Sequence, residues 1–218
     1  MPAAALKLPS VTLAAVTSIA LDQTARAVAE CLAHAEFARV LWISDAPPPG
    51  SGDPRIEWIR IAPLRSREAY SRFVLQDLGA LLASEHVLLI QWDGYILDPS
   101  AWRPEFLEHD YIGAPWPQFG DGMTVGNGGF SLRSKRLLLA TATFPETQEA
   151  EDIAICRTWR PRLEAELGVK FAPAELAQCF AFERTPRATA SFGFHGAFNL
   201  VKLVDAATAR DLVNSLEM

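Results

Sequence analysis

Two residues with metal-binding side chains each lie next to an apolar run of the sequence. Asp93 belongs to the segment Gln91-Trp92-Asp93-Gly94, directly after the most continuously apolar run, and His195 stands between Phe194 and Gly196. Carboxylate oxygens and neutral imidazole nitrogens bind divalent cations such as Mg²⁺ and Mn²⁺, which keep coordination positions open for phosphates. Structural interpretations compete with this one, because Asp-Gly is a common turn pair and a lone histidine is more often a satisfied structural residue.

A second motif, Gly126-Asn127-Gly128-Gly129, has three glycines in four residues. Glycine lets a backbone approach a ligand closely or adopt positive φ angles. Gly128 and Gly129 have no side chains that would keep a sugar ring away, and Asn127 offers an amide to its hydroxyls. A hairpin turn is the alternative, since Asn-Gly is a strong hairpin signal.

Glu151 and Asp152 open an amphipathic segment, and arginines surround the start of another predicted helix. An acidic side chain at the mouth of a cleft can take a proton from an attacking hydroxyl, although acidic residues also favour a helix N-terminus by themselves. The guanidinium groups of Arg65, Arg67 and Arg72 suit a diphosphate, or are solvated on a helix surface.

Strands and helices are predicted to alternate over the first 95 residues. The apolar runs predict strands at Val11–Val16, Arg39–Ser44, Arg55–Ala62 and His86–Gln91. Apolar residues at helical spacing predict a helix from Leu21 to Leu32, and a second that begins after a Ser66 cap and continues to Leu81. This alternation favours a mostly parallel sheet with helices on both faces, in which ligands bind beyond the carboxyl ends of the strands.

The second half of the chain is more irregular. We expect short strands at Asp110–Trp116, Gly128–Leu132 and Ser191–His195, and helices at Ser134–Thr141 and Asp205–Leu216. Glu151–Leu167 is expected to form a helix that breaks at Pro161.

The composition is that of one globular domain of 218 residues. With 26 acidic and 20 basic residues, the net charge of −6 disfavours binding to nucleic acid or to an anionic membrane surface. The three cysteines form no disulfide framework, so a cytoplasmic location is expected. We expect no integral membrane segment, because no apolar run approaches 18 residues or so.

Taken in order, six segments resemble an uncharacterised group of bacterial and fungal glycosyltransferase-like domains among the GT-A nucleotide-sugar transferases. The similarity covers about Val11 to Phe198, and its specific part is VGNGGFSLRS together with the preceding QWDG. The segments are HVLLIQWDGYIL, DYIGAPW, VGNGGFSLRS, ED, FAPAELAQCFAFE and FGFHG.

The resemblance implies a GT-A fold, a mixed and mostly parallel central sheet between helices. Residues 1–218 would form one domain, with a nucleotide-binding half at about 11–95 and a donor-sugar and acceptor half at about 96–218. Asp93 and His195 would bind Mn²⁺ or Mg²⁺ at the donor diphosphate, although Gln91 replaces the first acidic residue of the Asp-x-Asp motif. The predicted substrate-binding residues are Thr17, Arg72, Gln91, Trp92, Gly94, Asn127, Gly128 and Gly129.

The implied activity is transfer of a sugar from a nucleotide-diphosphate donor, a UDP-sugar, to a hydroxyl of a carbohydrate or other acceptor. Glu151 and Asp152 resemble the acidic pair of inverting enzymes, in which the Asp acts as base. One rival is a binding module that holds a sugar or nucleotide without transferring it, an alternative that the Gln91 substitution leaves open. The other is a hydrolase using Glu151 and Asp152, which is disfavoured because adjacent helical residues point about 100° apart.

Overall fold

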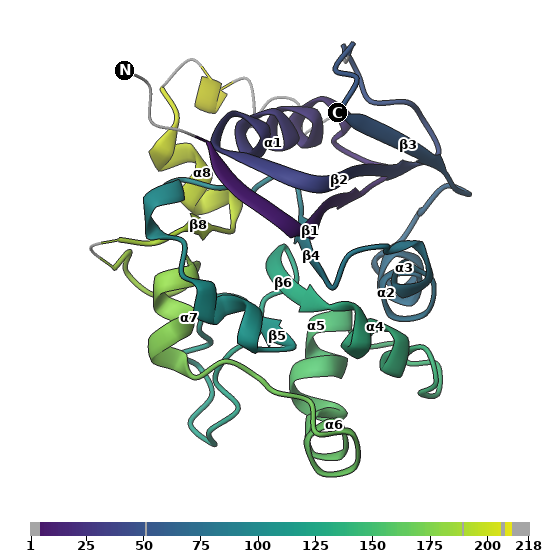
Figure 1. Cartoon of the computed structure of the whole chain (residues 1–218), viewed down its shortest axis with the longest axis vertical. Coiled ribbons are helices and arrows are strands. Elements are labelled where there is room, and N and C mark those ends of the chain that lie inside the picture. The colour runs from purple at the N-terminus through teal and green to yellow at the C-terminus, as the bar shows by residue number, and fades with distance from the viewer. Residues whose placement is uncertain (1–4, 51, 189, 206–207, 211–218) are drawn as a thin grey trace.

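A six-stranded sheet forms the centre of the computed structural model, which describes residues 5–50, 52–188, 190–205 and 208–210 (Figure 1). The strand order is β3-β2-β1-β4-β6-β5. The first four strands along the chain are parallel to one another, and β6 runs antiparallel to β4 and β5. The predicted mixed and mostly parallel sheet is therefore confirmed. The bounds are β1 (Leu6–Val16), β2 (Ala35–Ser44), β3 (Ile56–Arg60), β4 (His86–Ile90), β5 (Tyr111–Ile112) and β6 (Phe130–Ser134).

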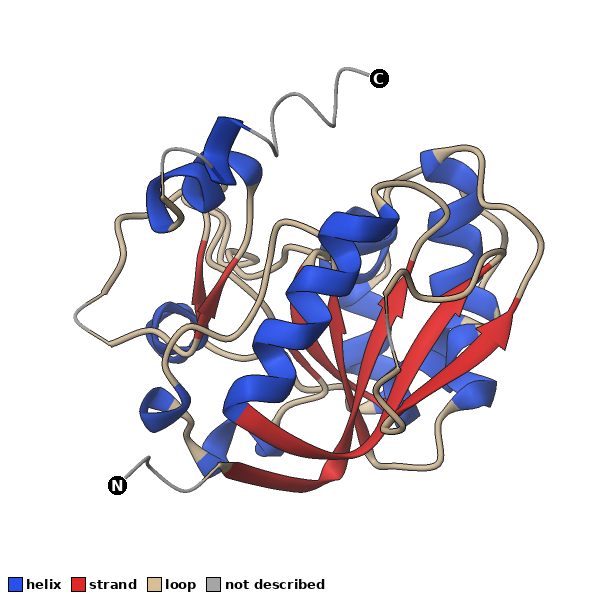
Figure 2. Ribbon diagram, turned by 90° about the horizontal axis from the view of Figure 1, so that it is seen from above, coloured by secondary structure: helices blue, strands red, loops and turns tan. Residues whose placement is uncertain are grey.

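Helices cover both faces of this sheet, as predicted (Figure 2). Successive side chains of a strand point to opposite faces, so β1 contributes to two separate apolar cores. Leu13 and Ala15 pack in the core that contains Val28 of α1 (Leu21–His34). Val16 packs on the other side with Val74 of α2 (Arg67–Gln76). Two further helices, α3 (Leu78–Leu81) and α4 (Lys135–Thr141), contribute to this second core.

The predicted helix over 151–167 is divided into three parts. It begins as α5 (Glu151–Ile153), continues as a π-helical turn at Ala154–Thr158, and ends as α6 (Arg160–Leu167). Within the turn, Trp159 N donates to Ala154 O at 2.8 Å. This bond spans five residues instead of the four of an α-helix, as is typical of a π-turn. The break therefore precedes Pro161, which lies in the first turn of α6, where a missing N–H costs little.

Several elements differ from the expectation or were not predicted. The strand expected at 110–116 is only β5, and β6 begins at Phe130, which leaves Gly126–Gly129 as a loop. The chain also forms α7 (Ala174–Phe180), a parallel pair β7 (Ala181–Phe182) and β8 (Gly193–Phe194), and α8 (Ala197–Leu203). Short 3-10 turns lie at Pro99–Ala101 and Pro104–Glu108.

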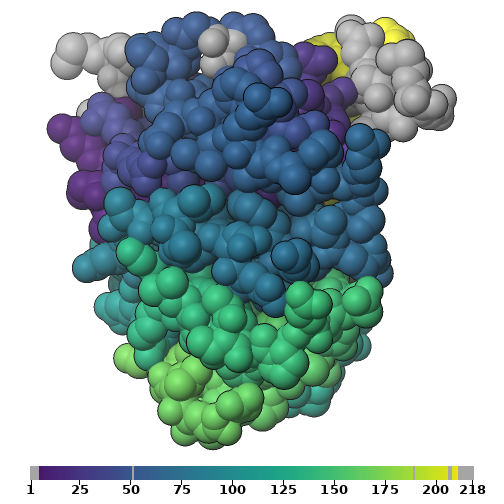
Figure 3. Space-filling view, turned by 90° about the vertical axis from the view of Figure 1, so that its right-hand side faces the viewer, coloured from purple at the N-terminus to yellow at the C-terminus, as the bar shows by residue number. Residues whose placement is uncertain are grey.

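The expected helix at 205–216 lies largely outside the described residues. Within the described part, Asp205 Oδ1 accepts a hydrogen bond from Thr208 N at 3.0 Å, as an N-cap residue does. The described helices include none that is long and apolar enough to cross a membrane. In the space-filling view, the blue first part of the chain lies above the green part (Figure 3). The predicted division into two halves at about residue 95 stays a prediction.

Candidate functional site

Two adjoining cavities lie beyond the carboxyl ends of β1 and β4. Each has a volume of about 280 Å³, and Arg67, Tyr70 and Gln91 line both. The first cavity is lined by residues that follow β1, β3 and β4, among them Thr17, Ser18, Leu64, Ser66 and Trp92. The second is lined mainly by later residues, among them Trp116, Asn127, Gly128, Gly129, Glu151, Asp152, Glu183, Arg184 and His195. In open, mostly parallel sheets, ligands bind beyond the carboxyl ends of the strands, and both cavities lie there.

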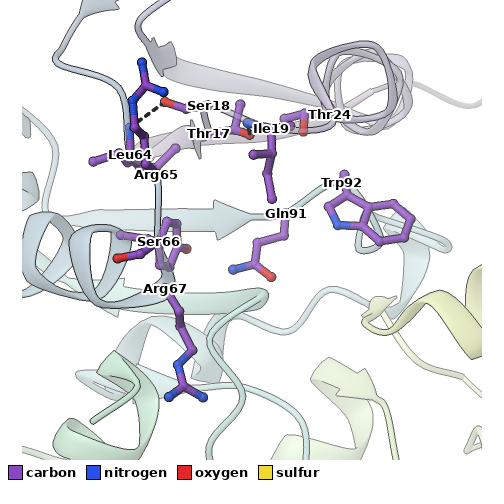
Figure 4. A pocket seen from close by; sticks show the side chains of 12 residues that line it. Thr17, Ser18, Ile19, Thr24, Leu64, Arg65, Ser66, Arg67, Gln91 and Trp92 are labelled. Carbon is purple, nitrogen blue, oxygen red and sulfur yellow. Dashed lines mark hydrogen bonds between the residues drawn. The ribbon is translucent and has the colours of Figure 1, made fainter. Parts of the chain in front are cut away.

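Hydrogen bonds within and between loops shape the first cavity. Thr17 Oγ1 accepts from Ile19 N at 3.2 Å, and Ser18 Oγ accepts from Leu64 N at 2.9 Å, which joins the loop after β1 to the loop after β3. Figure 4 shows Thr17 and Ile19 on one side, Ser66 and Arg67 on the other, and Gln91 between them. The structure thus brings the predicted residues Thr17, Gln91 and Trp92 to one cavity.

Arg67, rather than Arg72, is the arginine of α2 that lines these cavities. Its side chain extends away from Thr17 in Figure 4, and it lines the second cavity as well as the first. Arg72 lies 3.5 Å from Glu146 and belongs to a different surface depression. The two positions are five residues apart, which turns their side chains roughly 140° from one another on a helix. The structure therefore does not bring the predicted residue Arg72 to the site.

Asp93 and His195, 102 positions apart in the sequence, lie side by side. Asp93 Oδ1 is 3.2 Å from His195 Nε2, and Asp93 is only 7% exposed. Both atoms are buried, and within the described part of the chain neither has a partner other than this ion-pair contact with each other. A carboxylate oxygen has two lone pairs, so Asp93 Oδ1 retains binding capacity beyond this contact.

Glu183 is a third charged member of this cluster, and the sequence analysis did not single it out. It follows β7, and His195 follows β8, so the parallel pairing of these two strands places both residues at the same end. Glu183 Oε1 is 3.4 Å from His195 Nδ1, and Asn127 Nδ2 is 3.0 Å from the same nitrogen. The only available signal was its position at the end of the apolar segment Phe180–Phe182.

The two carboxylates determine the charge of His195. Burial alone would lower the pKa of His195, but the neighbouring carboxylates of Asp93 and Glu183 outweigh it and raise that pKa to about 9. The pKa of Glu183 is lowered, because the attraction of His195 exceeds the burial that opposes ionisation. A cation bound at Nε2 would have to displace a proton from this imidazole.

The loop Gly126–Gly129 lies against these residues in a fixed conformation. Asn127 is 2% exposed and has a φ of 72°, a left-handed conformation that asparagine tolerates better than most residues. Its Oδ1 accepts from Gly129 N at 3.0 Å. A Cβ atom on Gly129 would lie 1.9 Å from His195 Nε2, so only glycine permits this approach.

Gly94 has a structural position outside both cavities. A Cβ atom there would lie 2.8 Å from Phe194 O and 3.2 Å from Gly129 O. Its absent side chain thus lets the turn after β4 pack against the strand that leads to His195.

Glu151 and Asp152 lie at the second cavity in different environments. Asp152 is half-buried, and its Oδ2 accepts from Gly128 N at 3.1 Å while its Oδ1 accepts from Ile153 N at 2.8 Å. Glu151 is 3% exposed and its Oε1 lies 2.6 Å from Arg133 Nη2. Burial raises the pKa of Glu151 to about 7, against the opposing attraction of Arg133. Adjacent positions therefore give one accessible carboxylate and one that is paired inside the protein.

The pair Asp93 and His195 fits a divalent cation in two respects. Neighbouring ligand atoms of an octahedral cation, each about 2.1 Å from it, lie about 3.0 Å apart. The observed distance between Asp93 Oδ1 and His195 Nε2 is 3.2 Å. Both atoms also lack other partners among the described residues. No group of three or more His, Cys, Asp or Glu side chains in that same part of the chain is placed to hold a metal. A cation here would therefore need further ligands from substrate oxygens and water, as Mg²⁺ commonly does.

Fold and site together define a mixed α/β protein with a polar cleft at the carboxyl ends of parallel strands. The chain belongs to the family described as "Protein of unknown function (DUF5672)", whose model matches residues 54–195. A comparison with curated protein sequences found no match.

Solved structures with a similar fold include three glycosyltransferases. The galactosyltransferase LgtC in complex with donor and acceptor sugar analogues is 14% identical, with a TM-score of 0.43 over 85% of this chain and 86% of that chain. A glycosyltransferase involved in the glycosylation of the major capsid of PBCV-1 is 13% identical, with a TM-score of 0.46 over 86% and 92%. GlyE of Streptococcus pneumoniae TIGR4 is 13% identical, with a TM-score of 0.48, and the match spans 84% of this chain but only 53% of GlyE.

Proposed function

We propose that the protein transfers a sugar from a nucleotide-diphosphate donor, a UDP-sugar, to a hydroxyl of a carbohydrate or other acceptor. The observation that carries this proposal is the buried pair Asp93 Oδ1 and His195 Nε2, which have no partner but each other among the described residues. His195 lines the second of the two adjoining cavities. The first cavity would take the nucleoside and the second the sugar, with the diphosphate between them at Arg67 and Gln91.

Asp93 and His195 would hold Mn²⁺ or Mg²⁺. When bound, such a cation supplies positive charge to the diphosphate leaving group. Arg67 would add a positive charge, because its side chain is exposed, lies 3.6 Å from the Glu68 carboxylate and lines both cavities. Gln91 lines both cavities but carries no charge. Of the two acidic positions of the Asp-x-Asp motif, only Asp93 would therefore bind the cation at the diphosphate.

The glycine-rich loop would bind the donor sugar. Gly128 and Gly129 line the second cavity with backbone alone, and the loop is held by Asp152 on one side and by His195 on the other. Backbone contacts would orient the sugar ring of the donor against this loop. Because the bound sugar is already oriented, it loses less rotational freedom on reaching the transition state.

Asp152 is our candidate for the base. It is the accessible carboxylate of the acidic pair, and each of its oxygens retains a lone pair after accepting one backbone N–H. Asp152 would take the proton of the acceptor hydroxyl while that oxygen attacks C1 and the nucleoside diphosphate leaves. Attack from the face opposite the leaving group inverts the anomeric configuration. The proposed setting is the reducing cytoplasm, which agrees with the free thiols of Cys31, Cys156 and Cys179 in the described chain.

A nucleotide screen tests the proposal directly. Thermal unfolding is measured with UDP, GDP, ADP and CDP, each with and without Mn²⁺, and release of UDP from UDP-glucose and UDP-galactose is then followed with sugar acceptors and with water. We expect the largest rise in Tm with UDP and Mn²⁺ together, because a ligand that binds only the folded state stabilises it. UDP binding without release of UDP from either donor would favour the binding module, and no nucleotide response would refute the proposal.

A further inference from the structure

Arg133 is a fully buried arginine at the edge of the proposed site, and the mechanism above does not use it. It lies on β6, is 0% exposed, and forms an ion pair with Glu151 of α5 at 2.6 Å. Burying two charges is expensive, and replacing such a pair with apolar residues of similar size is often neutral or stabilising. A buried pair of this kind therefore calls for an explanation other than stability.

Besides Glu151, Arg133 bonds one carbonyl of the glycine-rich loop and Ser131, a residue of β6 that bonds the same carbonyl. Its Nη2 also donates to Gly128 O at 3.3 Å, and its Nε donates to Ser131 Oγ at 2.9 Å. Ser131 Oγ in turn donates to Gly128 O at 3.2 Å. The guanidinium lies 5.2 Å from the centre of the Tyr111 ring, and Tyr111 Oη donates to Asn127 O at 2.9 Å. Two successive carbonyls of the loop are thus held from beneath by buried side chains.

Glu151 contacts the same residue of the loop, Gly128. A Cβ atom on Gly128 would lie 2.2 Å from Glu151 Oε1, so the carboxylate packs directly on the Gly128 backbone. Gly128 N donates to Asp152, the neighbour of Glu151, while Gly129 lies against His195. The loop therefore connects the buried pair to both Asp152 and His195.

We infer that Arg133 and Glu151 form a positioning pair that fixes the backbone of residues 127–129 and, through it, the relative placement of Asp152 and His195. In this role Glu151 acts on the loop rather than on the acceptor proton, although it lines the second cavity and is the first residue of the acidic pair. This inference rests on the proposed function for its consequence in catalysis, but the placement of the loop can be measured without any activity.

The two members of the pair are compared in the full-length chain through Glu151→Gln and Arg133→Met. Arg136→Met serves as control, because Arg136 pairs with Asp110 away from both cavities. We expect both test variants to lower kcat by at least about tenfold and by similar factors, with UDP affinity within about twofold of the parent. Rates are taken per folded molecule, well below Tm, so that loss of folded protein does not imitate a loss of kcat.

A direct catalytic role of Glu151 predicts a different result. Glu151→Gln would then lose roughly 10²–10⁴-fold in kcat, as expected for a missing base, while Arg133→Met kept most of the parent rate. Such a difference in kcat between the two variants would overturn the inference. A kcat equal to that of the parent in both variants would overturn it as well.

Backbone amide resonances of Gly128 and Gly129 give the readout that does not depend on transfer. We expect both test variants to shift these two resonances and the control to leave them unchanged. Unchanged resonances in Glu151→Gln would contradict the inference even if the protein proved to transfer no sugar. If a single variant fails to fold, the double variant Arg133→Met, Glu151→Leu removes both charges together. We expect it to fold with the Gly128 and Gly129 resonances shifted, and parent-like resonances there would equally contradict the inference.

Discussion

Two buried aspartates at opposite ends of β4 differ in how their oxygens are used. Asp110 and Asp93 are each 7% exposed. Asp110 Oδ1 accepts from Ser134 Oγ at 2.6 Å and Asp110 Oδ2 accepts from Lys170 N at 2.8 Å, with Arg136 bound to both oxygens. Asp93 Oδ1 has a single contact among the described residues, the 3.2 Å ion pair with His195 Nε2. Two equally buried aspartates thus differ in how many bonds their oxygens make.

The difference separates a structural carboxylate from a candidate binding carboxylate. A satisfied cluster such as that of Asp110 connects β6, α4 and the segment before α7, and it leaves no capacity for a ligand. A buried oxygen with few bonds costs stability unless something more binds it. The number of bonds, rather than burial or residue type, is therefore the informative signal. The experiments below test the site that Asp93 would serve and compare Asp93 with Asp110.

The largest effect is expected at the proposed base. Asp152→Asn should lower kcat by roughly 10²–10⁴-fold, because the amide cannot accept the proton of the acceptor hydroxyl. Affinity for UDP with Mn²⁺ should remain within about twofold, since Asp152 lies at the second cavity. Steady-state kinetics and calorimetry measure the two quantities, and a parent-like kcat would remove Asp152 from the role of base.

A smaller effect is expected when the arginines of α2 are exchanged for alanine. Arg67→Ala should weaken UDP binding by about tenfold, as expected for loss of a charge-assisted contact to phosphate. Arg72→Ala is the matched control on the same helix and should change UDP affinity by less than about twofold. Equal losses in the two variants would show that the geometry of α2 does not select Arg67.

The two aspartates should also differ in their effect on stability. Asp110→Asn should lower Tm by several degrees, because about 1 kcal/mol corresponds to 2–4 °C in a chain of this size and several charge-assisted bonds are weakened. Asp93→Asn should lower Tm by less, since it weakens one ion pair, with His195, whereas Asp110 is bonded to Ser134, Arg136 and Lys170. Calorimetric unfolding of both variants decides the order, and a larger loss for Asp93→Asn would invert the comparison.

The smallest effect concerns pH. Burial raises the pKa of Asp110, but its bonds to Arg136, Ser134 and Lys170 prevail and lower it. A carboxylate with a lowered pKa stabilises the fold above its unfolded pKa of about 3.9, and this contribution is lost as the pH falls through the folded pKa. The difference in Tm between parent and Asp110→Asn should therefore be constant above about pH 5 and narrow below about pH 4. A difference that widened in acid would contradict this sign.

The sequence predicted the repetitive part of the fold and parts of the site. Strands β1 to β4 and helices α1 and α2 follow from apolar periodicity, and the motifs around Asp93 and His195 follow from residue type. Arg67 was recoverable as well, since the Ser66 cap fixes the start of α2 and hence which arginine faces the cleft.

Other parts of the site have no local signal. Strands β7 and β8 have two residues each, too short for a period, so the approach of Glu183 to His195 was not predictable. Ser131 and Arg133 alternate with Phe130 and Leu132, a pattern typical of a strand with one solvated face. That face is instead covered, and the buried pair with Glu151 arises only when distant segments meet.

Calorimetry of UDP binding to the parent and to Asp93→Ala, each with and without Mn²⁺, tests the central claim most directly. We predict that Mn²⁺ strengthens UDP binding by the parent at least about tenfold and has no effect on Asp93→Ala, while the affinity without metal is the same for both. Equal strengthening by Mn²⁺ in the two proteins, or none in the parent, would show that Asp93 and His195 do not hold a cation at the nucleotide.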